Sequence, residues 1–333
     1  MKIFITGATG FIGKILTRRL AEQGHHIHAL FRSIEKTRSL DHQNITWFKG
    51  SLNEVDTLIQ AMNTCDQVYH IAAYASVWAK DPSVFYEHNV TGTKNILAAA
   101  EKTGIKKIVY VSTAGVFDPS SGQVINENTP YPEKFFAHYE RSKYHAEQIV
   151  LEYAINGLPV VVVNPTRVYG PGPLIKSNGT VMIADRYIRG KWRIIPGNGN
   201  SLGNYVFVND VVQGFIQAMN SGKPGERYIL SGEDASFNDL IKIIADISGK
   251  YYRMYRLPQS LILIASSVML LYARLSGSEP LIIPDYVRKF GIDWSVSCEK
   301  ARKELGYNPI TLRQGITNTL EWISRGYKYD TYE

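Results

Sequence analysis

The stretch Thr6-Gly-Ala-Thr-Gly-Phe-Ile-Gly13 decides the fold of this 333-residue chain. It follows an apolar, strand-like run, Lys2 to Ile5, and leads into residues 14–23, which have the pattern of a helix ending at Gly24. Glycines with this spacing between a strand and a helix allow a tight turn and a close backbone approach to a pyrophosphate. The helix N-terminus adds unpaired N–H groups and the positive end of a dipole. We therefore predict a dinucleotide-binding turn, with a ligand-free glycine turn as the alternative.

Strand-like and helix-like segments alternate from this turn to residue 164. The expected strands are 3–5, 26–31, 45–48, 67–71, 108–112 and 159–164, and the expected helices are 14–23, 54–62, 82–103 and 139–156. Strands separated by helices are typical of βαβ units. The predicted fold class is α/β, with a Rossmann-type, doubly wound parallel sheet.

The pattern of alternating strands and helices ends after Asn164. Residues 169–173 and 196–200 are rich in Gly, Pro and Asn, which indicates turns. Helices are expected at 181–189, 210–220, 237–248, 260–275 and 298–305. We predict two domains: residues 1–165 bind NADP(H), and residues 166–333 form a smaller, mostly helical substrate lobe interleaved with the end of the sheet.

The bulk composition narrows the classes of partner. The chain has 37 basic and 30 acidic residues, a net charge of +7 and no basic run, which argues against nucleic acid and favours a small anionic ligand. Its two cysteines, Cys65 and Cys298, match neither metal-ligand spacing nor a disulfide framework. A strand-like segment follows Met1 directly, so we expect no signal peptide, a cytoplasmic location and no bound metal.

The most apolar window is Ser260 to Ala273. It is shorter than the ~20 residues of a membrane span. We therefore expect a buried or amphipathic helix and regard membrane association as unlikely; a helix at a membrane surface or substrate entrance is the alternative.

A second motif, Tyr139-Glu-Arg-Ser-Lys143, carries chemistry. Tyr139 and Lys143 are one helical turn apart and share a face. A tyrosine with a pKa near ~10 is a poor acid or base at neutral pH, and a nearby ammonium favours the phenolate. Ser112 and Thr113 place hydroxyls at the carboxyl end of the fifth strand, where open α/β sheets bind ligands. A surface helix pair is the alternative for the Tyr–Lys motif taken alone.

The end of the second strand bears on the choice of cofactor. An acidic residue here would bind a ribose 2′-hydroxyl, but this chain has Arg32, followed by Lys36 and Arg38. A guanidinium suits a 2′-phosphate. NADP(H) is therefore favoured, NAD(H) is possible, and a solvated basic loop is the alternative without a ligand.

Together these motifs resemble the extended short-chain dehydrogenase/reductases of the NAD-dependent epimerase/dehydratase family, over residues 1 to about 325. The matching segments are 6–13, His70-Ile-Ala-Ala73, Asn89-Val-Thr-Gly-Thr93, Ser112-Thr-Ala114, Tyr139 to Lys143, 164–172, 208–211 and 300–309. The resemblance implies a catalytic triad of Thr113, Tyr139 and Lys143. It also implies a dimer through the helices 82–103 and 139–156.

Motifs and resemblance together define the expected cofactor contacts. These are Gly7, Thr9, Gly10, Phe11, Ile12, Gly13, Arg32, Lys36, Ser51, Leu52, Ile71, Ala72, Ala73, Asn89, Val111, Tyr139, Lys143, Pro165, Thr166 and Val168. Two positions depart from the family. Ser51 stands where an adenine-binding Asp is frequent, and Gly203 stands where enzymes of nucleotide sugars often carry an Arg. Residues 201–211 look more like the dihydroflavonol 4-reductase branch, as do residues 257–283.

Aromatic and apolar residues dominate the segments expected around the nicotinamide. They are Tyr74, Trp78, Phe135, Phe136, Tyr169, Leu174, Trp192 and Tyr205. Because several should be core residues, we expect only about half to touch substrate and choose Tyr74, Trp78, Phe136, Tyr169 and Tyr205. His138 precedes the catalytic tyrosine and could contact ligand, but a solvated loop position is at least an equal alternative. This set suits an apolar or flat carbonyl compound.

Three functions remain open from the sequence. The first is an NADP(H)-dependent reductase of a ketone or aldehyde, with Tyr139 as acid/base. The second is a sugar or sugar-nucleotide epimerase/dehydratase that recycles its hydride, against which the Arg lost at Gly203 counts. The third is a non-catalytic NADP-binding sensor, against which the complete triad counts.

Overall fold

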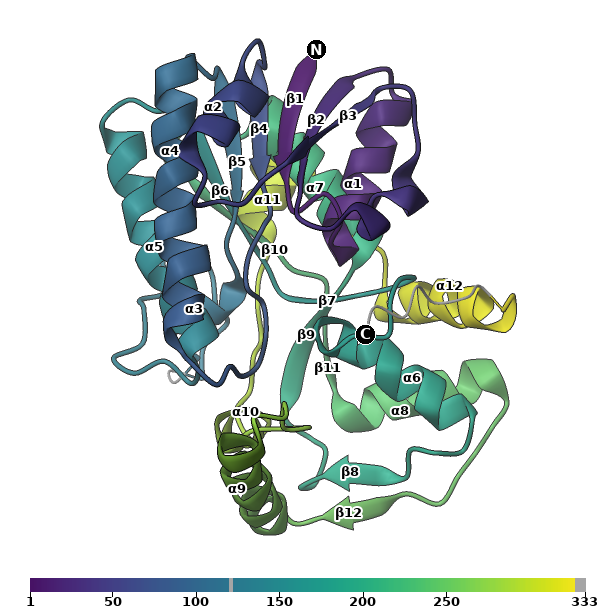
Figure 1. Ribbon diagram of the computed structural model, residues 1–333. Helices are drawn as coiled ribbons and strands as arrows, with labels where there is room; N and C mark the ends of the chain where they lie inside the picture. The colour runs from purple at the N-terminus through teal and green to yellow at the C-terminus, as the bar shows by residue number, and fades with distance from the viewer. Residues whose placement is uncertain (120–121, 327–333) are drawn as a thin grey trace.

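A seven-stranded parallel sheet forms the centre of the computed structural model, which describes residues 1–119 and 122–326 (Figure 1). The strand order is β10-β6-β5-β4-β1-β2-β3. Their bounds are β1 Lys2–Thr6, β2 His26–Phe31, β3 Ile45–Lys49, β4 Gln67–His70, β5 Lys107–Val111, β6 Val160–Pro165 and β10 Arg227–Leu230. The order reverses between β1 and β4, and ligands bind at such a switch point. The predicted Rossmann-type sheet is confirmed.

Helices cover both faces of this sheet. One face carries α1 (Phe11–Glu22), α7 (Val208–Ser221) and α11 (Glu299–Leu305), and the other carries α2 (Val55–Met62), α4 (Gly92–Thr103) and α5 (His138–Ile155). Because both faces are covered, the strands are apolar without alternation, as in Val160 to Val163, which are all fully buried. These two layers hold the site at the carboxyl edge of the strands.

The helix expected over 82–103 is not regular. It consists of α3 (Ser83–Tyr86), a π-helical turn η3 (Glu87–Thr91) and α4. A π turn inserts an extra residue into the helical ladder and often marks a functional position. Here it carries Asn89, which is buried.

The second lobe is built around two small sheets. The sheet β11-β9-β7 comprises β7 (Arg167–Tyr169), β9 (Leu202–Phe207) and β11 (Glu233–Ser236), and β8 (Ile194–Pro196) pairs with β12 (Tyr255–Leu257). Helices α6 (Gly179–Ile188), α8 (Phe237–Ser248) and α12 (Leu312–Ser324) pack with the larger of them. Sequence analysis missed these strands, which are at most six residues long. From this half of the chain, β10 joins the large sheet, and α7 and α11 pack on that sheet.

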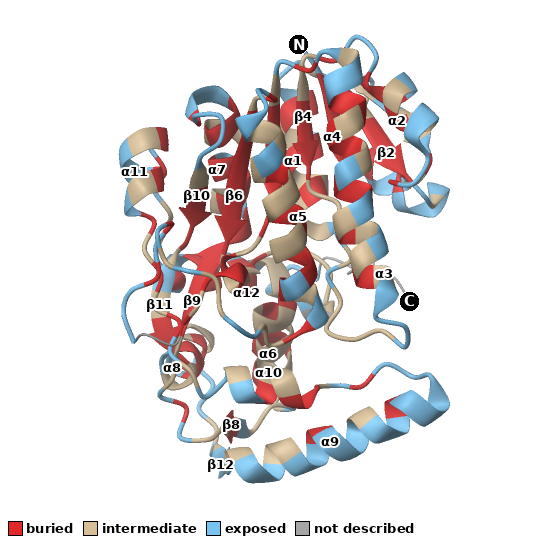
Figure 2. Cartoon of the chain, turned by 90° about the vertical axis from the view of Figure 1, so that its left-hand side faces the viewer, coloured by how far each residue is buried: buried red, intermediate tan, exposed pale blue. Residues whose placement is uncertain are grey.

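The helix α9 (Gln259–Ser276) contradicts the expectation of a buried core helix. Only Ser266 and Ala273 in it are buried, and α9 lies at the edge of the second lobe, mostly exposed (Figure 2). By length and composition it is apolar enough to cross a membrane. The short helix α10 (Pro284–Lys289) packs against it on the inner side. The expectation failed because an apolar composition shows that a helix avoids water. It does not show whether the protein core or another apolar surface covers that helix.

Candidate active site

The turn between β1 and α1 leaves room only for backbone. Gly7 has a φ of +74°, and a Cβ there would lie 2.8 Å from the Ala72 nitrogen. A Cβ on Gly13 would lie 1.9 Å from the Gly7 carbonyl oxygen. No acidic residue occupies the first turn of α1, which begins at Phe11. This exposed backbone at a helix N-terminus fits the pyrophosphate of a dinucleotide.

The second lobe reaches this turn through a glycine. A Cβ on Gly172 would lie 2.5 Å from Cε2 of Phe11. The ring of Phe11 therefore packs directly on the backbone of the turn that follows β7. The predicted cofactor contact Phe11 thus also joins the two lobes.

A buried chain of hydrogen bonds connects β1 with β4 and α4. The Ala72 nitrogen donates to Thr6 Oγ1 at 3.2 Å, and Thr6 Oγ1 lies 2.7 Å from His70 Nδ1. His70 Nε2 lies 2.9 Å from Thr93 Oγ1. Burial, and secondly the charge of Lys143, lower the pKa of His70 to about 3. A neutral imidazole therefore holds the loop after β4 in place, a role that sequence reasoning did not assign.

Asn89 links that loop to the catalytic helix. Its Oδ1 accepts from the Tyr74 nitrogen at 2.7 Å, and its Nδ2 donates to Ser142 Oγ at 2.9 Å. Its side chain is buried and engaged in these bonds. Asn89 therefore positions the loop after β4 against α5, and its cofactor contact stays a prediction.

The three predicted catalytic residues come from neighbouring elements. Thr113 follows β5 and caps the short helix η4 (Ala114–Val116), its Oγ1 accepting from the Gly115 nitrogen at 3.1 Å. Tyr139 and Lys143 lie on α5, which begins one residue before Tyr139. Lys143 is 2% exposed, and its Nζ donates to the Val111 carbonyl at 2.7 Å.

The electrostatics of this group differ from the expectation. Burial lowers the pKa of Lys143 to about 7, partly opposed by the Glu147 carboxylate. Burial, and secondly the carboxylate of Glu140, raise the pKa of Tyr139. The predicted lowering of the tyrosine pKa by Lys143 is therefore corrected. The physical reason is that Lys143 is buried and its amine is directed at the Val111 carbonyl. A raised pKa makes the Tyr139 hydroxyl a weaker acid in this arrangement than a free tyrosine.

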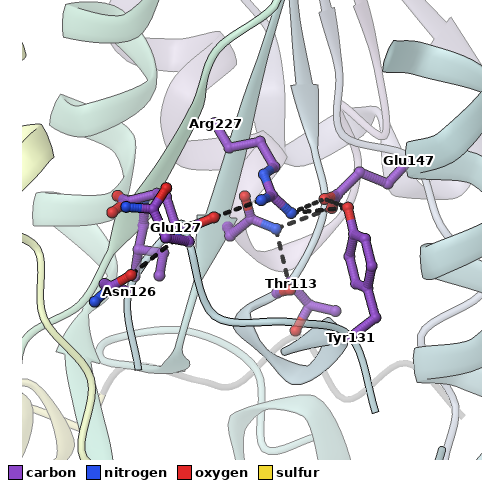
Figure 3. Close-up of polar contacts among 9 residues, drawn as sticks. Thr113, Asn126, Glu127, Tyr131, Glu147 and Arg227 are labelled. Carbon is purple, nitrogen blue, oxygen red and sulfur yellow. Dashed lines mark hydrogen bonds and ion pairs between the residues drawn. The ribbon is translucent and has the colours of Figure 1, made fainter. Parts of the chain in front are cut away.

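A network around Glu147 supports this group from behind (Figure 3). Glu147 Oε1 accepts from the Tyr131 hydroxyl at 3.2 Å and pairs with Arg227 Nη1 at 3.4 Å. Its Oε2 accepts from Asn164 Nδ2 at 3.0 Å, and the same Nδ2 donates to the Thr113 carbonyl at 3.2 Å. The network thus fixes the backbone of Thr113. Sequence reasoning missed it, although Glu147 lies one turn beyond Lys143 on the same helix face.

A second ion pair ties the catalytic helix to α10. Glu140 Oε1 lies 2.9 Å from Lys289 Nζ, and both side chains are largely buried. The same ammonium lies 4.4 Å from the ring centre of Trp294. Because Glu140 adjoins Tyr139, α10 supplies the counter-ion of the carboxylate next to the tyrosine. A separation of 149 residues hid this contact from sequence analysis.

The basic loop after β2 lies beside the π turn. Arg32 is exposed, and its Nη1 lies 3.4 Å from His88 Nε2. Lys36 and Arg38 follow in two short 3₁₀ helices, Ile34–Lys36 and Arg38–Leu40, and are also exposed. The three basic side chains therefore lie at the protein surface beyond the carboxyl end of β2.

The other expected cofactor residues lie along the carboxyl edge of the strands. Thr9, Gly10 and Ile12 follow β1, Ser51 and Leu52 follow β3, Ile71 and Ala73 follow β4, Val111 ends β5, and Pro165 ends β6. Some have internal partners. Leu52 packs against Gly92, Thr166 Oγ1 donates to Asn204 Oδ1 at 2.7 Å, and Val168 packs against the core.

The residues chosen for substrate fall into two groups. Tyr74 and Trp78 lie in the loop after β4, and Phe136 precedes α5, all partly exposed. Tyr169 and Tyr205 are corrected: both belong to the core of the second lobe, and the Tyr169 hydroxyl donates to the Leu312 carbonyl. Leu174 and Trp192 pack against that same core. Phe135 contacts Tyr144, and the exposed His138 stacks on Phe85.

An arginine from another strand occupies the place of the one missing at Gly203. A Cβ on Gly203 would lie 2.4 Å from Nη1 of Arg167, which is on β7. The guanidinium also lies 5.7 Å from the ring centre of Tyr205. Glycine at 203 therefore makes room for a cation supplied from residue 167.

Comparison with known proteins agrees with this geometry. The model of the NAD-dependent epimerase/dehydratase family matches residues 3–231. A protein of Synechocystis named "Putative dihydroflavonol 4-reductase" is 35% identical, covering 97% of this chain and 95% of its own. A Stigmatella aurantiaca ketoreductase of a 4-farnesyl-dihydroquinoline oxide is 29% identical over 95% of both chains. The crystal structure of gox2253 superposes with a TM-score of 0.82 at 32% identity, covering 98% of this chain and 99% of that one.

The glycine turn, the Tyr–Lys pair on α5 and these matches agree over nearly the whole chain. The chain belongs to the NAD-dependent epimerase/dehydratase family and is an NAD(P)-dependent enzyme of the extended short-chain dehydrogenase/reductase type.

Proposed function

We propose that this enzyme is an NADP(H)-dependent reductase of a ketone or aldehyde on a fairly apolar small molecule. The observation that carries the proposal is geometric: α5 places Tyr139 and Lys143 one helical turn apart, and Lys143 bonds the Val111 carbonyl at the carboxyl end of β5, which Thr113 follows. In reduction the carbonyl oxygen must gain a proton, and the Tyr139 hydroxyl is the donor that this arrangement offers. The names of the relatives, a dihydroflavonol reductase and a ketoreductase of a farnesylated compound, support the same class.

Reduction of the carbonyl group requires one hydride and one proton, and different groups supply and position them. The nicotinamide, when bound, supplies the hydride to the carbonyl carbon. Tyr139 donates its hydroxyl proton to the carbonyl oxygen, which becomes the alcohol. Thr113 Oγ1, still able to donate while it caps η4, holds the same oxygen. Lys143, with a pKa of about 7, passes between its charged and neutral forms at working pH and restores the tyrosine proton.

NADP(H) preference rests on Arg32 in the exposed loop after β2. We expect Arg32→Asp to lower the ratio of kcat/KM for NADPH to that for NADH by at least about tenfold, because the variant repels the 2′-phosphate. Arg253→Asp, an equal charge change in the second lobe, serves as the control. An unchanged ratio in the Arg32 variant would remove the assignment.

The reaction itself is tested with purified enzyme, NADPH and a panel of apolar ketones and aldehydes. We expect stoichiometric loss of reduced-cofactor absorbance with alcohol formation, and a fall in kcat of about 10²- to 10⁴-fold in Tyr139→Phe. NADPH binding, followed by fluorescence, should survive in that variant. Binding without turnover across the panel would instead support a non-catalytic sensor.

A second candidate is an epimerase or dehydratase of a sugar or sugar nucleotide. The observation that favours it is Arg167, whose guanidinium fills the space at Gly203 and could meet a phosphate. Product formation without net cofactor oxidation, lost in Arg167→Leu, would establish this alternative and overturn the reductase.

We also propose an oligomeric state and a cellular location for the enzyme. We propose a homodimer through α4 and α5, which pack side by side on one face of the sheet (Figure 1). We also propose a cytoplasmic location, supported by Cys65 and Cys298, which are both free and buried. Light scattering of the purified protein tests the dimer: a mass of one chain at micromolar concentration contradicts it.

A further inference from the structure

The outer face of α9 is a continuous apolar surface. Its stripe consists of Leu261, Ile264, Val268, Leu271 and Leu275, each between 52% and 79% exposed. Tyr272 and Met269, also exposed, widen this outer face of α9 well beyond the stripe. Large exposed apolar patches of this kind mark contact with another molecule or a membrane.

The attachment of α9 shows how it can meet a partner. Its inner side packs on α10, and Gln259 Nε2 donates to the Val287 carbonyl at 3.0 Å. β12 ends two residues before α9, and α10 follows it and packs back on it (Figure 2). Both ends of α9 therefore return to the same lobe, and the outer face of the helix runs along the surface uncovered.

The segment that contains α9 is basic between Asp246 and Glu279, and Arg274 lies on α9 itself. Residues 247–278 contain no Asp or Glu, but they contain Lys250, Arg253, Arg256 and Arg274. These four basic residues are all exposed. Tyr251, Tyr255 and Tyr272, also exposed, add the aromatic side chains that are enriched at membrane–water interfaces.

These features distinguish a lipid surface from a second copy of the chain. A helix–helix seam needs only a narrow stripe, whereas this apolar face is wider. A second copy packed on this face would also bring Arg274 of each α9 to the interface, and α9 itself carries no acidic residue to pair with it. Anionic headgroups would neutralise the basic residues of this segment, at a gain that accrues with each one near the surface.

We propose that the outer face of α9 binds the surface of an anionic lipid bilayer, with the helix lying in the plane of the interface. This replaces our expectation that membrane association is unlikely. The proposal does not depend on the reductase reaction, because it rests on residues outside the catalytic group.

The test is flotation of the full-length protein with vesicles. One set is pure phosphatidylcholine, and the other contains about 30% phosphatidylglycerol, which supplies the negative surface potential. We expect binding to the anionic vesicles, weaker binding to the neutral ones, and a loss of at least about tenfold in Val268→Glu/Leu271→Glu. Both positions are about 60% exposed, so the thermal midpoint should be retained.

A matched control carries the same charge change elsewhere. Val55→Glu/Val124→Glu alters two exposed apolar residues of the first lobe and should float like the wild type. Three results overturn the proposal: wild-type protein absent from the floated fraction with both vesicles, equal binding by the α9 double variant, or a dimer in light scattering that the α9 substitutions dissociate. The last would assign the face to a second copy. NADPH oxidation, measured without vesicles, reports on the proposed reaction separately.

Discussion

The helices α5 and α9 have 18 residues each. They differ in what they bury: α5 buries ionisable side chains, whereas α9 exposes most of its apolar ones. α5 buries Glu140, Lys143 and Glu147, whereas the buried residues of α9 are only Ser266 and Ala273. α9 instead exposes leucine, isoleucine and valine. Buried charges and exposed apolar patches are the two departures from ordinary globular packing that carry information.

The difference lies in how each departure is compensated. On α5 every buried ionisable side chain has a partner: Lys289 for Glu140, the Val111 carbonyl for Lys143, and Asn164 with Arg227 for Glu147. An unpaired buried charge would cost on the order of several kcal/mol, so these partners stabilise the charges that α5 carries. The outer face of α9 has only solvent beside it among the described residues. Buried ionisable groups with partners inside the protein, as on α5, indicate a catalytic site. Exposed apolar side chains without protein partners, as on α9, indicate a surface that binds another molecule.

The largest loss of stability is expected for Glu147→Ala on α5. Removing the carboxylate leaves the Arg227 guanidinium without its counter-ion, although Arg227 keeps Tyr131 and Asn164 keeps the Thr113 carbonyl. The loss of this buried pair should lower the free energy of unfolding by about 3–5 kcal/mol. Urea unfolding followed by fluorescence measures it. Glu152→Ala, an exposed position on the same helix, should cost less than about 0.5 kcal/mol. Equal effects in the two variants would show that the buried network contributes nothing.

The second effect concerns the pH dependence of Lys143. Its folded pKa of about 7 lies below its unfolded value, so between these values only the unfolded chain holds the proton. Stability should therefore rise with pH, by about 2 kcal/mol from pH 7.5 to 9. Lys143→Met should lack this rise. Urea unfolding of both proteins at each pH gives the difference, and parallel pH profiles would contradict a buried, neutral lysine.

The third and smallest effect is expected on α9. Leu271→Gln replaces a side chain that is 60% exposed, so the free energy of unfolding should change by less than about 0.5 kcal/mol. A core leucine would cost about 2–5 kcal/mol on truncation. Leu97→Ala on α4, fully buried, provides that reference in the same urea experiment. A core-sized loss in Leu271→Gln would mean that this face is covered in the folded protein.

Prediction from sequence succeeded where the determining contacts are local. Gly7 and Gly13 are six residues apart, and the strand at 26–31 and the helix at 237–248 have the predicted bounds. The second lobe was predicted less well, because strands as short as β7 and β8 carry too few residues for a pattern. Two of the five chosen substrate residues, Tyr169 and Tyr205, proved to be core, since an aromatic side chain is equally suited to a ligand or to a neighbouring helix.

By itself the sequence determined the βαβ order, the dinucleotide turn and the catalytic helix, because these depend on residues within a few turns of one another. The tertiary structure decided what surrounds them. It brought Arg227 to Glu147 across 80 residues and Lys289 to Glu140 across 149. It also decided that α9 faces outward, since exposure depends on which surfaces the rest of the chain leaves uncovered. Local geometry is encoded along the chain, whereas charge compensation and burial arise only when distant segments pack.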